Sequence, residues 1–443
     1  MNMNLNRRQF LVSGALATGA LALGGCVTKM PRKLATNEKL NIGIIGCGGK
    51  GWGDMEGVAA AGENIVALCD ADEIVLKRAA KKYPKAKVYR DYRKMLDEVR
   101  ELDAVTVSTP DHHHFPAAMR AIERGLHTYV QKPLTHSIWE ARQLTLAARK
   151  HRVATQMGNQ GTSGEGIRQL VEMLGAGALG QVREVHIWTD RPIWPQGKER
   201  PAGADPIPKH LDWDLWLGPA PVRPYKSKYP DVDRHVYHPF CWRGWWDFGT
   251  GALGDIGCHA MNHPMWALKL GAPLSAEVIE TSGMVKNDAY PSWSIIRWDF
   301  PARGDLAPLK LFWYDGGKLP EKRPEMGNRG YSDNGQLYVG DKGVFCSGRL
   351  WPDALKNSFK QPAPTLPRIE KENHYQDWLI ACRGGRPACS NFDFAGPLTE
   401  TVLLGNIALR LGRKLEWDAK NLRIPGCPEA DPLIRRAYRK GWA

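Results

Sequence analysis

The chain has 443 residues, more than one hydrophobic core usually supports, so two domains are expected. Its content of 43% hydrophobic and 24% charged residues is typical of a globular protein. The formal net charge of +14 is spread along the sequence, without a basic helix or an aromatic RNA-binding motif. We therefore expect a solvated basic surface and no nucleic-acid partner.

The first 26 residues have the pattern of an export signal. Residues 6–11 (NRRQFL) form a twin-arginine pattern, and the apolar stretch 12–25 is too short and glycine-rich to span a membrane. Residues 23–26 (LGGC) resemble a lipoprotein cleavage box that would make Cys26 a lipidated first residue. An ordinary cleaved signal, with Cys26 incidental, is the alternative. We expect recognition by the Tat translocase, a tether over 27–38, and a periplasmic or otherwise extracytoplasmic protein that touches the membrane only through a lipid on Cys26.

Residues 39–160 alternate short apolar runs with helix-compatible stretches. The predicted strands are 40–46, 64–69, 86–89, 103–108, 127–131 and 153–157. The predicted helices lie near 50–62, 73–82, 91–99, 115–125 and 137–150. This alternation predicts an α/β domain of the Rossmann type, in which a doubly wound parallel sheet has helices on both faces.

A glycine-rich turn follows the first predicted strand. Gly46, Gly48, Gly49 and Gly51 occupy a G-x-G-x-x-G segment, and Asp70 ends the next strand. Glycines allow a tight turn close to a pyrophosphate, the following helix N-terminus favours its charge, and the carboxylate accepts the ribose hydroxyls. This pattern predicts NAD binding. NADP stays possible because a lysine, Lys50, stands beside the turn.

Residues 161–425 show a different pattern of predicted elements. A helix is predicted at 164–177, a strand at 181–189, a long Trp/Pro-rich irregular stretch at 190–250 and a helix starting near Gly254. Further strands are expected at 276–284, 292–300, 308–314, 335–339 and 343–346. We expect a C-terminal α+β domain with a mainly antiparallel open sheet, followed by a tail at 426–443. The nine cysteines show no C-x-x-C pair, and no structural disulfide is expected.

A loop with three histidines follows the fourth predicted strand, at the sheet edge where α/β domains bind ligands. Thr109, Pro110 and His114 are therefore candidate cofactor contacts. Consecutive side chains point apart, so His112, His113 and His114 are not expected to share a metal ion.

Gln131 and Lys132 end the fifth predicted strand, immediately before Pro133. The proline fixes the turn and holds both side chains over the sheet edge. The ammonium of Lys132 could stabilise a developing alkoxide or share a proton with a substrate hydroxyl. A solvated surface lysine is the ordinary alternative.

Asp255 and His259 are four residues apart, so on a helix they share one face. An imidazole can take a hydroxyl proton, and a carboxylate can orient it or bind a neighbouring hydroxyl. A purely structural Asp–His hydrogen bond is the alternative. His263 continues this face and raises the possibility of a metal site. Pro264 disfavours helical geometry at His263 and the glutamate of H-E-x-x-H is missing, so no metal is predicted.

With these motifs the chain resembles the Gfo/Idh/MocA oxidoreductases, the glucose–fructose oxidoreductase and inositol dehydrogenase family. The resemblance covers about residues 39 to 415 and rests on the glycine turn, the T-P-x-x-x-H run, the lysine-proline pair and the Asp-x-x-x-His pair. It implies that Lys132, Asp255 and His259 surround the reacting carbon of a sugar or polyol, with His259 as acid/base. It also implies a homodimer or homotetramer. Two residues depart from the family: Gln131 replaces a Glu, and Asn262 stands where an acid commonly follows the histidine.

Aromatic and polar residues in the irregular stretch are candidates for a carbohydrate pocket. The chain has 17 tryptophans, and aromatic faces stack on sugar rings. For the tryptophans of this region as a group, core packing is an equal alternative; they are Trp188, Trp194, Trp213, Trp216, Trp242, Trp245 and Trp246. The candidate substrate contacts are Asn159, Gln160, His235, Tyr237, His238, Trp242, Arg243 and Asn262.

We therefore expect an exported oxidoreductase that transfers hydride between NAD and a sugar or polyol secondary alcohol. Tat export carries folded proteins and no nicotinamide pool exists outside the cytoplasm, so the cofactor is expected to be tightly bound. Some exported relatives oxidise a sugar transiently, eliminate a glycosidic substituent, add water and reduce again. A glycoside hydrolase of this kind is therefore the alternative, and a non-catalytic scaffold is a third.

Overall fold

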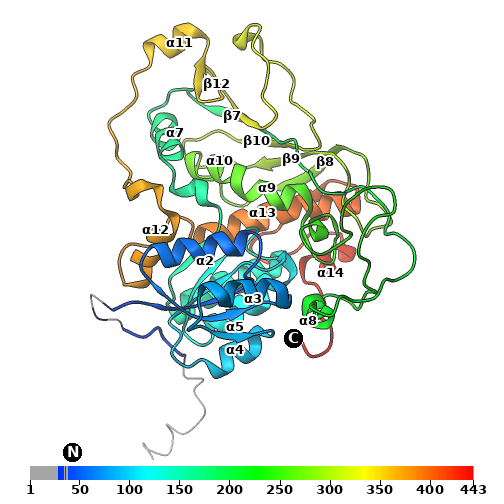
Figure 1. Ribbon diagram of the computed structural model, residues 1–443. Coiled ribbons are helices and arrows are strands. Elements are labelled where there is room, and N and C mark those ends of the chain that lie inside the picture. The colour runs from blue at the N-terminus through cyan, green and yellow to red at the C-terminus, as the bar shows by residue number, and fades with distance from the viewer. Residues whose placement is uncertain (1–27, 34, 36–37, 443) are drawn as a thin grey trace, which may run out of the picture.

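The computed structural model describes residues 28–33, 35 and 38–442. The predicted signal at 1–26 lies outside these residues. Figure 1 shows a Rossmann domain, in blue and cyan, below a sheet domain in green and yellow. The long orange helix α13 runs between them. The predicted fold class is confirmed.

The first domain is built on a six-stranded parallel sheet of order β3-β2-β1-β4-β5-β6. Its strands are β1 (Asn41–Ile45), β2 (Asn64–Cys69), β3 (Lys87–Tyr89), β4 (Ala104–Val107), β5 (His127–Val130) and β6 (Thr155–Met157). Its helices are α2 (Lys50–Ala60), α3 (Glu73–Lys82), α4 (Tyr92–Glu98), α5 (His114–Ile122) and α6 (Ile138–His151). The apolar strands are buried between two helical layers, as their composition requires.

The second domain contains an eight-stranded mixed sheet of order β13-β12-β11-β7-β10-β9-β8-β14. Only β7 and β10 pair in parallel. Its strands are β7 (Val182–Trp188), β8 (Ser275–Thr281), β9 (Ser294–Phe300), β10 (Leu309–Tyr314), β11 (Gly335–Gly340), β12 (Gly343–Cys346), β13 (Arg349–Trp351) and β14 (Leu415–Glu416). Its helices are α7 (Glu165–Gly175), α8 (Trp213–Leu217), α9 (Gly251–Ala260), α10 (Asn262–Ala267) and α11 (Asp353–Ser358).

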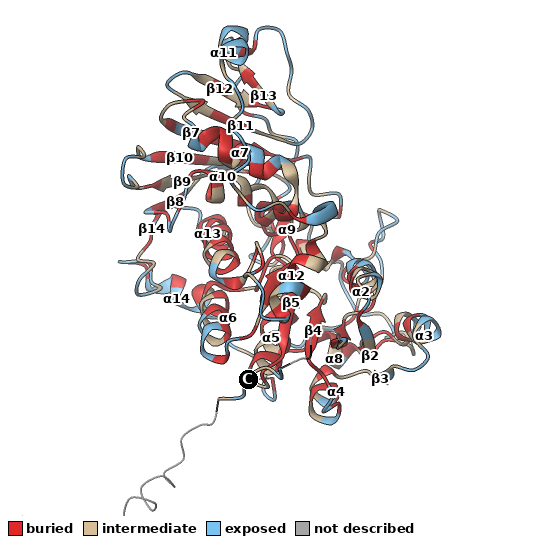
Figure 2. Cartoon of the chain, turned by 90° about the vertical axis from the view of Figure 1, so that its left-hand side faces the viewer, coloured by how far each residue is buried: buried red, intermediate tan, exposed pale blue. Residues whose placement is uncertain are grey.

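One face of this sheet is packed against helices and the other faces outward. Along β9, Ser294, Ile296, Trp298 and Phe300 are buried, while the residues between them are only half-buried. Figure 2 shows the helices on the right of the sheet and the open face on its left. This alternation of buried and half-buried residues is the pattern of a one-sided sheet.

Three C-terminal helices tie the domains together: α12 (His374–Cys382), α13 (Phe392–Leu411) and α14 (Asp431–Ile434). Trp378 and Leu379 of α12 pack in the same apolar cluster as Leu40, Ile42 and Ile44 of the Rossmann domain. The tail also returns to that domain, where Arg436 pairs with Glu140. A chain segment assigned by sequence to the second domain thus completes the core of the first.

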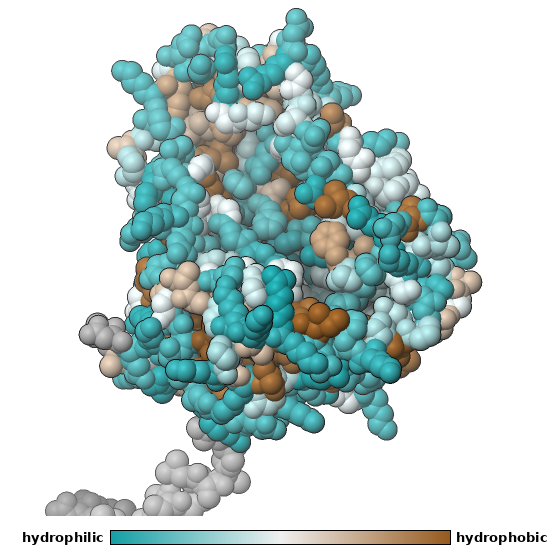
Figure 3. Space-filling model, viewed as in Figure 1, coloured by the Kyte–Doolittle hydropathy of each residue, from teal (hydrophilic) through white to brown (hydrophobic). Residues whose placement is uncertain are grey.

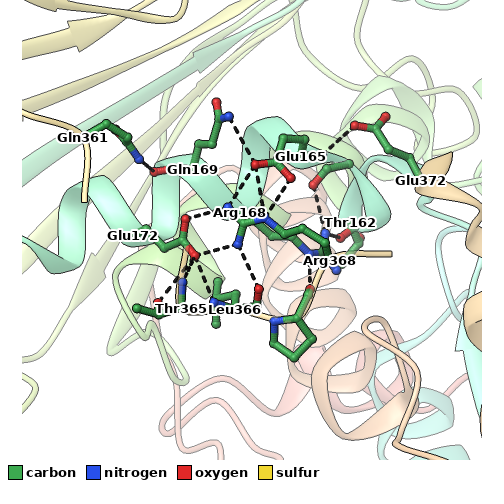
Figure 4. Close-up of polar contacts among 12 residues, drawn as sticks. Thr162, Glu165, Arg168, Gln169, Glu172, Gln361, Thr365, Leu366, Arg368 and Glu372 are labelled. Carbon is green, nitrogen blue, oxygen red and sulfur yellow. Dashed lines mark hydrogen bonds and ion pairs between the residues drawn. The ribbon is translucent and has the colours of Figure 1, made fainter. Parts of the chain in front are cut away.

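The segment that leads from the sheet to α12 is fastened to α7 by charged hydrogen bonds, shown in Figure 4. Arg368 donates to Glu172 and to Glu165, while Arg168 donates to the carbonyl oxygen of Pro367 at 2.8 Å. The Arg368 side chain and two backbone N–H groups lower the pKa of Glu172 to about 2, outweighing the smaller effect of burial. These contacts fix the path between the domains.

The residues of the predicted tether that the structure describes lie against the Rossmann domain. Arg32 donates to Asp103 at 2.8 Å, and the His151 ring lies 3.0 Å from the carbonyl oxygen of Lys29. This part of the segment is thus attached to the domain surface. Within the described residues, no helix has the length and apolar character needed to cross a bilayer, and the cysteines are unpaired thiols.

Candidate active site

The turn after β1 has the geometry that a dinucleotide phosphate requires. Gly46 has a φ of 87°, and a Cβ there would lie 2.7 Å from backbone atoms of Ser108. A Cβ on Gly51 would lie 2.0 Å from the carbonyl oxygen of Gly46. Only glycine fits at these two positions. The turn presents the N-terminus of α2, which has no side-chain cap, so its N–H groups can bind an anion.

Asp70 at the end of β2 is positioned beside this turn. Its carboxylate accepts hydrogen bonds from the backbone N–H groups of Cys47 at 2.8 Å and Asp72 at 2.9 Å. Burial raises the pKa of Asp70 and outweighs these two bonds, which lower it. Asp70 lines the cavity beside the glycine turn, at the strand end where a Rossmann domain binds a ribose.

A cavity of about 1100 Å³ extends from the glycine turn into the second domain. Pockets for a single small ligand are roughly 300–1,000 Å³, so this cavity has room for a dinucleotide and a further molecule. Lys132, Asp255 and His259 form part of its wall. Figure 3 shows the surface hollowed between the two domains, with hydrophobic residues among hydrophilic ones at the rim.

Lys132 and Asp255 form an ion pair in the wall. The Lys132 ammonium donates to Oδ1 and to the backbone carbonyl oxygen of Asp255, each at 2.7 Å. Arg243 donates its Nε to the same Oδ1 at 3.0 Å. Burial alone would raise the pKa of Asp255, but the two cations hold it well below its usual range. Asp255 is therefore a permanent anion that positions Lys132.

His259 lies one turn beyond Asp255 on α9, as the four-residue spacing predicts. Burial, followed by the charge of Lys132, lowers the pKa of His259 from its usual 6.5 to about 3, although Asp255 opposes this shift. The ring is thus neutral at neutral pH and able to accept a proton.

Two of the three consecutive histidines connect the domains. The His112 and His113 rings both lie against the carbonyl oxygen of Trp216, at 3.0 and 2.9 Å. His114 lies against the carbonyl oxygens of Pro133 and Thr109. Burial lowers the pKa values of His113 and His114 to about 4. These rings order the backbone around the site, and His114 does not itself line the cavity.

Two family descriptions match the chain in succession. Residues 40–159 match the NAD-binding Rossmann fold of the Gfo/Idh/MocA oxidoreductase family, and residues 162–304 match its C-terminal alpha/beta domain. The chain belongs to the Gfo/Idh/MocA oxidoreductase family. The resemblance inferred from the motifs is therefore confirmed.

Solved structures with a similar fold cover most of the chain. GenD2 from gentamicin A biosynthesis, in complex with NAD, is 20% identical, with a TM-score of 0.58 over 88% of this chain and 99% of that one. The WlbA dehydrogenase from Bordetella pertussis, in complex with NADH and UDP-GlcNAcA, is 16% identical, with a TM-score of 0.61 over 86% and 99%. At these identities the likeness shows the fold alone.

A curated relative of this Gfo/Idh/MocA protein is the alpha-N-acetylgalactosaminidase of Shewanella oneidensis. It is 27% identical over 205 residues, which are 40% of this chain and 44% of the relative. The chain thus spans less than half the length of the curated relatives it matches.

The prediction of NAD as cofactor is confirmed by the NAD-binding family description. The residues present fit this cofactor. The glycine turn and the free end of α2 suit the pyrophosphate, and Asp70 suits the ribose. Three further predicted cofactor contacts, Thr109, Pro110 and Gln131, also line the cavity.

The cavity wall includes some of the predicted substrate contacts and not others. Gln160, His235, His238, Trp242 and Arg243 line it. Three predicted contacts lie outside the lining. Tyr237 is buried among aromatic rings and accepts from Arg200, Asn159 donates to the Cys258 carbonyl oxygen, and Asn262 donates to Thr162.

The expectation that Pro264 disfavours helical geometry at His263 is wrong. A new helix, α10, begins at Asn262, so Pro264 lies in its first turn, where no backbone N–H is needed. The His263 ring lies 3.2 Å from the side-chain amide of Gln336 and outside the cavity lining. Among the described residues, no group of three His, Cys, Asp or Glu side chains is arranged to hold a metal ion.

Sequence reasoning missed Asp54, a buried carboxylate on α2. It accepts from Gln131 at 2.8 Å, Ser108 at 2.7 Å, Tyr375 at 2.8 Å and Lys50 at 2.5 Å. This contact explains why Gln131 departs from the family: an amide donates to Asp54, whereas a glutamate would place a second carboxylate against it. The four-residue spacing of Lys50 and Asp54 was the only signal in the sequence.

Asp111 is a second buried carboxylate that the sequence did not single out. It lines the cavity and accepts from Thr250 at 2.6 Å, just before α9 begins. Burial raises the pKa of Asp111 to about 7. Through its bond with Thr250, Asp111 links the histidine loop to α9, the helix that carries Asp255 and His259.

Hydrogen bonds to Asp72 join the irregular stretch 190–250 to the nucleotide end of the cavity. We call the contacts of His210 and His238 with Asp72 the Asp72 latch. Asp72 accepts from His210 at 2.9 Å and from His238 at 3.0 Å. The backbone N–H of Glu73 donates to the His210 carbonyl oxygen, and that of Asp212 donates to Ala71. The second domain thus covers the ribose end of the site.

Proposed function

We propose that this protein is an NAD-dependent enzyme that oxidises a secondary alcohol of a sugar or polyol. The observation that carries the proposal is the meeting of Lys132, Asp255 and His259 at one end of the cavity that begins at the glycine turn. Bound NAD would supply the hydride acceptor. The neutral His259 would take the proton of the reacting hydroxyl, and the ammonium of Lys132, oriented by Asp255, would donate to the same oxygen and stabilise its developing charge.

The cofactor is proposed to stay bound through the catalytic cycle. The Asp72 latch over the ribose end supports this proposal, because release would require its hydrogen bonds to open. The test is to purify residues 27–443, denature the protein and assay the supernatant for nicotinamide dinucleotides. We expect close to one NAD or NADH per chain. A cofactor-free protein that turns over only with added NAD would contradict retention.

A second candidate function is glycoside hydrolysis through transient oxidation. The match to the Shewanella oneidensis alpha-N-acetylgalactosaminidase, and to glycosyl hydrolase family 109 proteins of other Shewanella strains, favours it. Oxidation would acidify a neighbouring C–H bond, elimination would release the substituent, and addition of water followed by reduction would restore the sugar. The net reaction consumes only water. Release of free sugar from a glycoside without accumulation of NADH would identify this activity.

We also propose export by the twin-arginine route with lipidation of Cys26. Residues 6–11 and 23–26 carry the proposal. Mass spectrometry of the mature N-terminus and cell fractionation test it. We expect a lipid-modified Cys26 in the membrane fraction, and cytoplasmic retention of an Arg7→Lys/Arg8→Lys variant. An unprocessed N-terminus would contradict the proposal.

The open face of the second sheet is proposed to form a homodimer or homotetramer interface. The half-buried residues on the outward face of β9 support this proposal. Sedimentation analysis of the purified protein is the test, and a monomer at micromolar concentration would contradict it.

A further inference from the structure

The catalytic cavity continues into a second hollow of about 390 Å³ near the surface. Ile193, Lys228, His235 and Phe240 line both spaces, and Asp233 and Arg234 line only the outer one. The shared walls make the outer hollow an extension of the site. A molecule that reacts at Lys132 and His259 can therefore reach into it.

Phe240 presents an apolar ring at the junction of the two spaces. The residue is 44% exposed, and its backbone has φ 77° and ψ −46°, a region that residues with a Cβ rarely occupy. Ile193, which lines the same junction, is 53% exposed. A large side chain that is both exposed and strained adds little to folding, and strained residues cluster at ligand sites.

The position of the Phe240 ring is coupled to the Asp255 carboxylate. The Arg243 guanidinium lies 4.4 Å from the centre of this ring and donates to the Phe240 carbonyl oxygen at 3.0 Å. The same guanidinium donates to Asp255. Trp194 contacts the ring edge-on, with ring centres 5.9 Å apart. One arginine thus fixes the aromatic face relative to the reacting centre.

Charged groups of both signs line the same hollow. Lys228 pairs with Asp233 at 2.7 Å, and Lys228 faces His235 across a short β-bridge. An aromatic face for the C–H side of a ring, with charged donors and acceptors for its hydroxyls, is the chemistry of a carbohydrate site. We propose that this hollow binds a second sugar ring, so that the substrate is a glycoside of at least two rings. This inference rests on the proposed function.

The test compares methyl glycosides with methyl disaccharides that share the same non-reducing ring. Gluco-, galacto- and N-acetylgalactosamine-configured pairs are titrated into the NAD-loaded protein by tryptophan fluorescence, and reduction of bound NAD is followed by absorbance. We expect at least one disaccharide to bind about tenfold more tightly than its methyl glycoside. Phe240→Ala should remove this preference, so that the two members of a pair bind within about twofold of each other. Phe240→Tyr, which keeps the ring, should retain the preference.

The outcomes separate this inference from the proposed function. Equal binding of both members of every pair, or an equal effect of Phe240→Ala on both, would overturn the second-ring site. If the methyl glycosides reduce bound NAD in that case, the proposed function is still supported although the second-ring site is not. Absence of both binding and reduction across all pairs would overturn both.

Discussion

The ammonium of Lys132 lies 2.7 Å from both Oδ1 and the carbonyl oxygen of Asp255. One donor group is therefore held by two acceptors of the same residue, and its direction over the cavity is set by α9. This contact joins the end of a Rossmann strand to a helix of the second domain. The reacting groups can be assembled only when the two domains are packed together.

Replacing Lys132 by methionine should lower kcat by about 100-fold or more, because the substrate oxygen loses its charged donor. Steady-state kinetics with a sugar that reduces bound NAD is the measurement. Lys77→Met is the matched control, since that lysine is 74% exposed on α3. A Lys132→Met enzyme with the activity of the control would contradict the role of Lys132.

The pH profile of kcat/KM should lack an acid limb down to about pH 4, because the pKa of His259 is lowered to about 3 and the neutral base persists. Lys132 contributes to this lowering, so the residual activity of Lys132→Met should decline at a higher pH than that of the wild type. Asp255 acts in the opposite direction, and Asp255→Asn should move the decline to lower pH. A wild-type limb near pH 6.5, unmoved in both variants, would exclude His259 as the base.

Gln131→Glu should destabilise the protein, because the new carboxylate would face Asp54 in a buried setting. Thermal unfolding measures the effect, and we expect a loss of about 2 kcal/mol, near the range for an unsatisfied buried polar group. Combining Gln131→Glu with Asp54→Asn should recover part of this loss. Gln131→Ala, which removes the donor without adding charge, should cost less. If the free-energy changes of Gln131→Glu and Asp54→Asn simply add in the double variant, residues 131 and 54 are not coupled.

The His210→Ala/His238→Ala variant should release NAD faster than the wild type. Both rings hydrogen-bond to Asp72 across the ribose end, and loss of two such bonds corresponds to roughly 10- to 100-fold in rate. Displacement of bound NAD by a labelled analogue is the measurement. Keeping Asp72 preserves its cap on α3. An unchanged release rate in a folded double variant would show that the latch does not retain the cofactor.

Much of the site could be predicted from the sequence because its main relations are local or follow from topology. The glycine turn must follow a strand, and Asp255 and His259 share a helical face. Lys132 reaches them because strand ends of a parallel sheet meet at one edge. The side chains of Lys132, Asp255 and His259 all line the cavity.

The remaining features depend on contacts between residues far apart in the chain. Asp54 is held by Tyr375, which lies 321 positions away, and no local pattern reveals that partner. The sequence also gave no signal for α13. This helix is buried on most sides and contains Pro397, so it lacks the one-sided apolar pattern by which surface helices are recognised. The packing of the irregular stretch 190–250 determines which aromatic residues face the cavity, and this too could not be predicted from a local pattern.

Mixing the NAD-loaded protein with sugars and glycosides tests the central claim most directly, with absorbance of reduced nicotinamide as the readout. The wild type should form up to one NADH per chain with at least one substrate, and His259→Gln should do so at least about 100-fold more slowly. Transient formation followed by return, with release of free sugar, would identify the hydrolytic cycle. Absence of reduction with every sugar, or equal rates in wild type and His259→Gln, would contradict the assignment of this site as a sugar-oxidising centre.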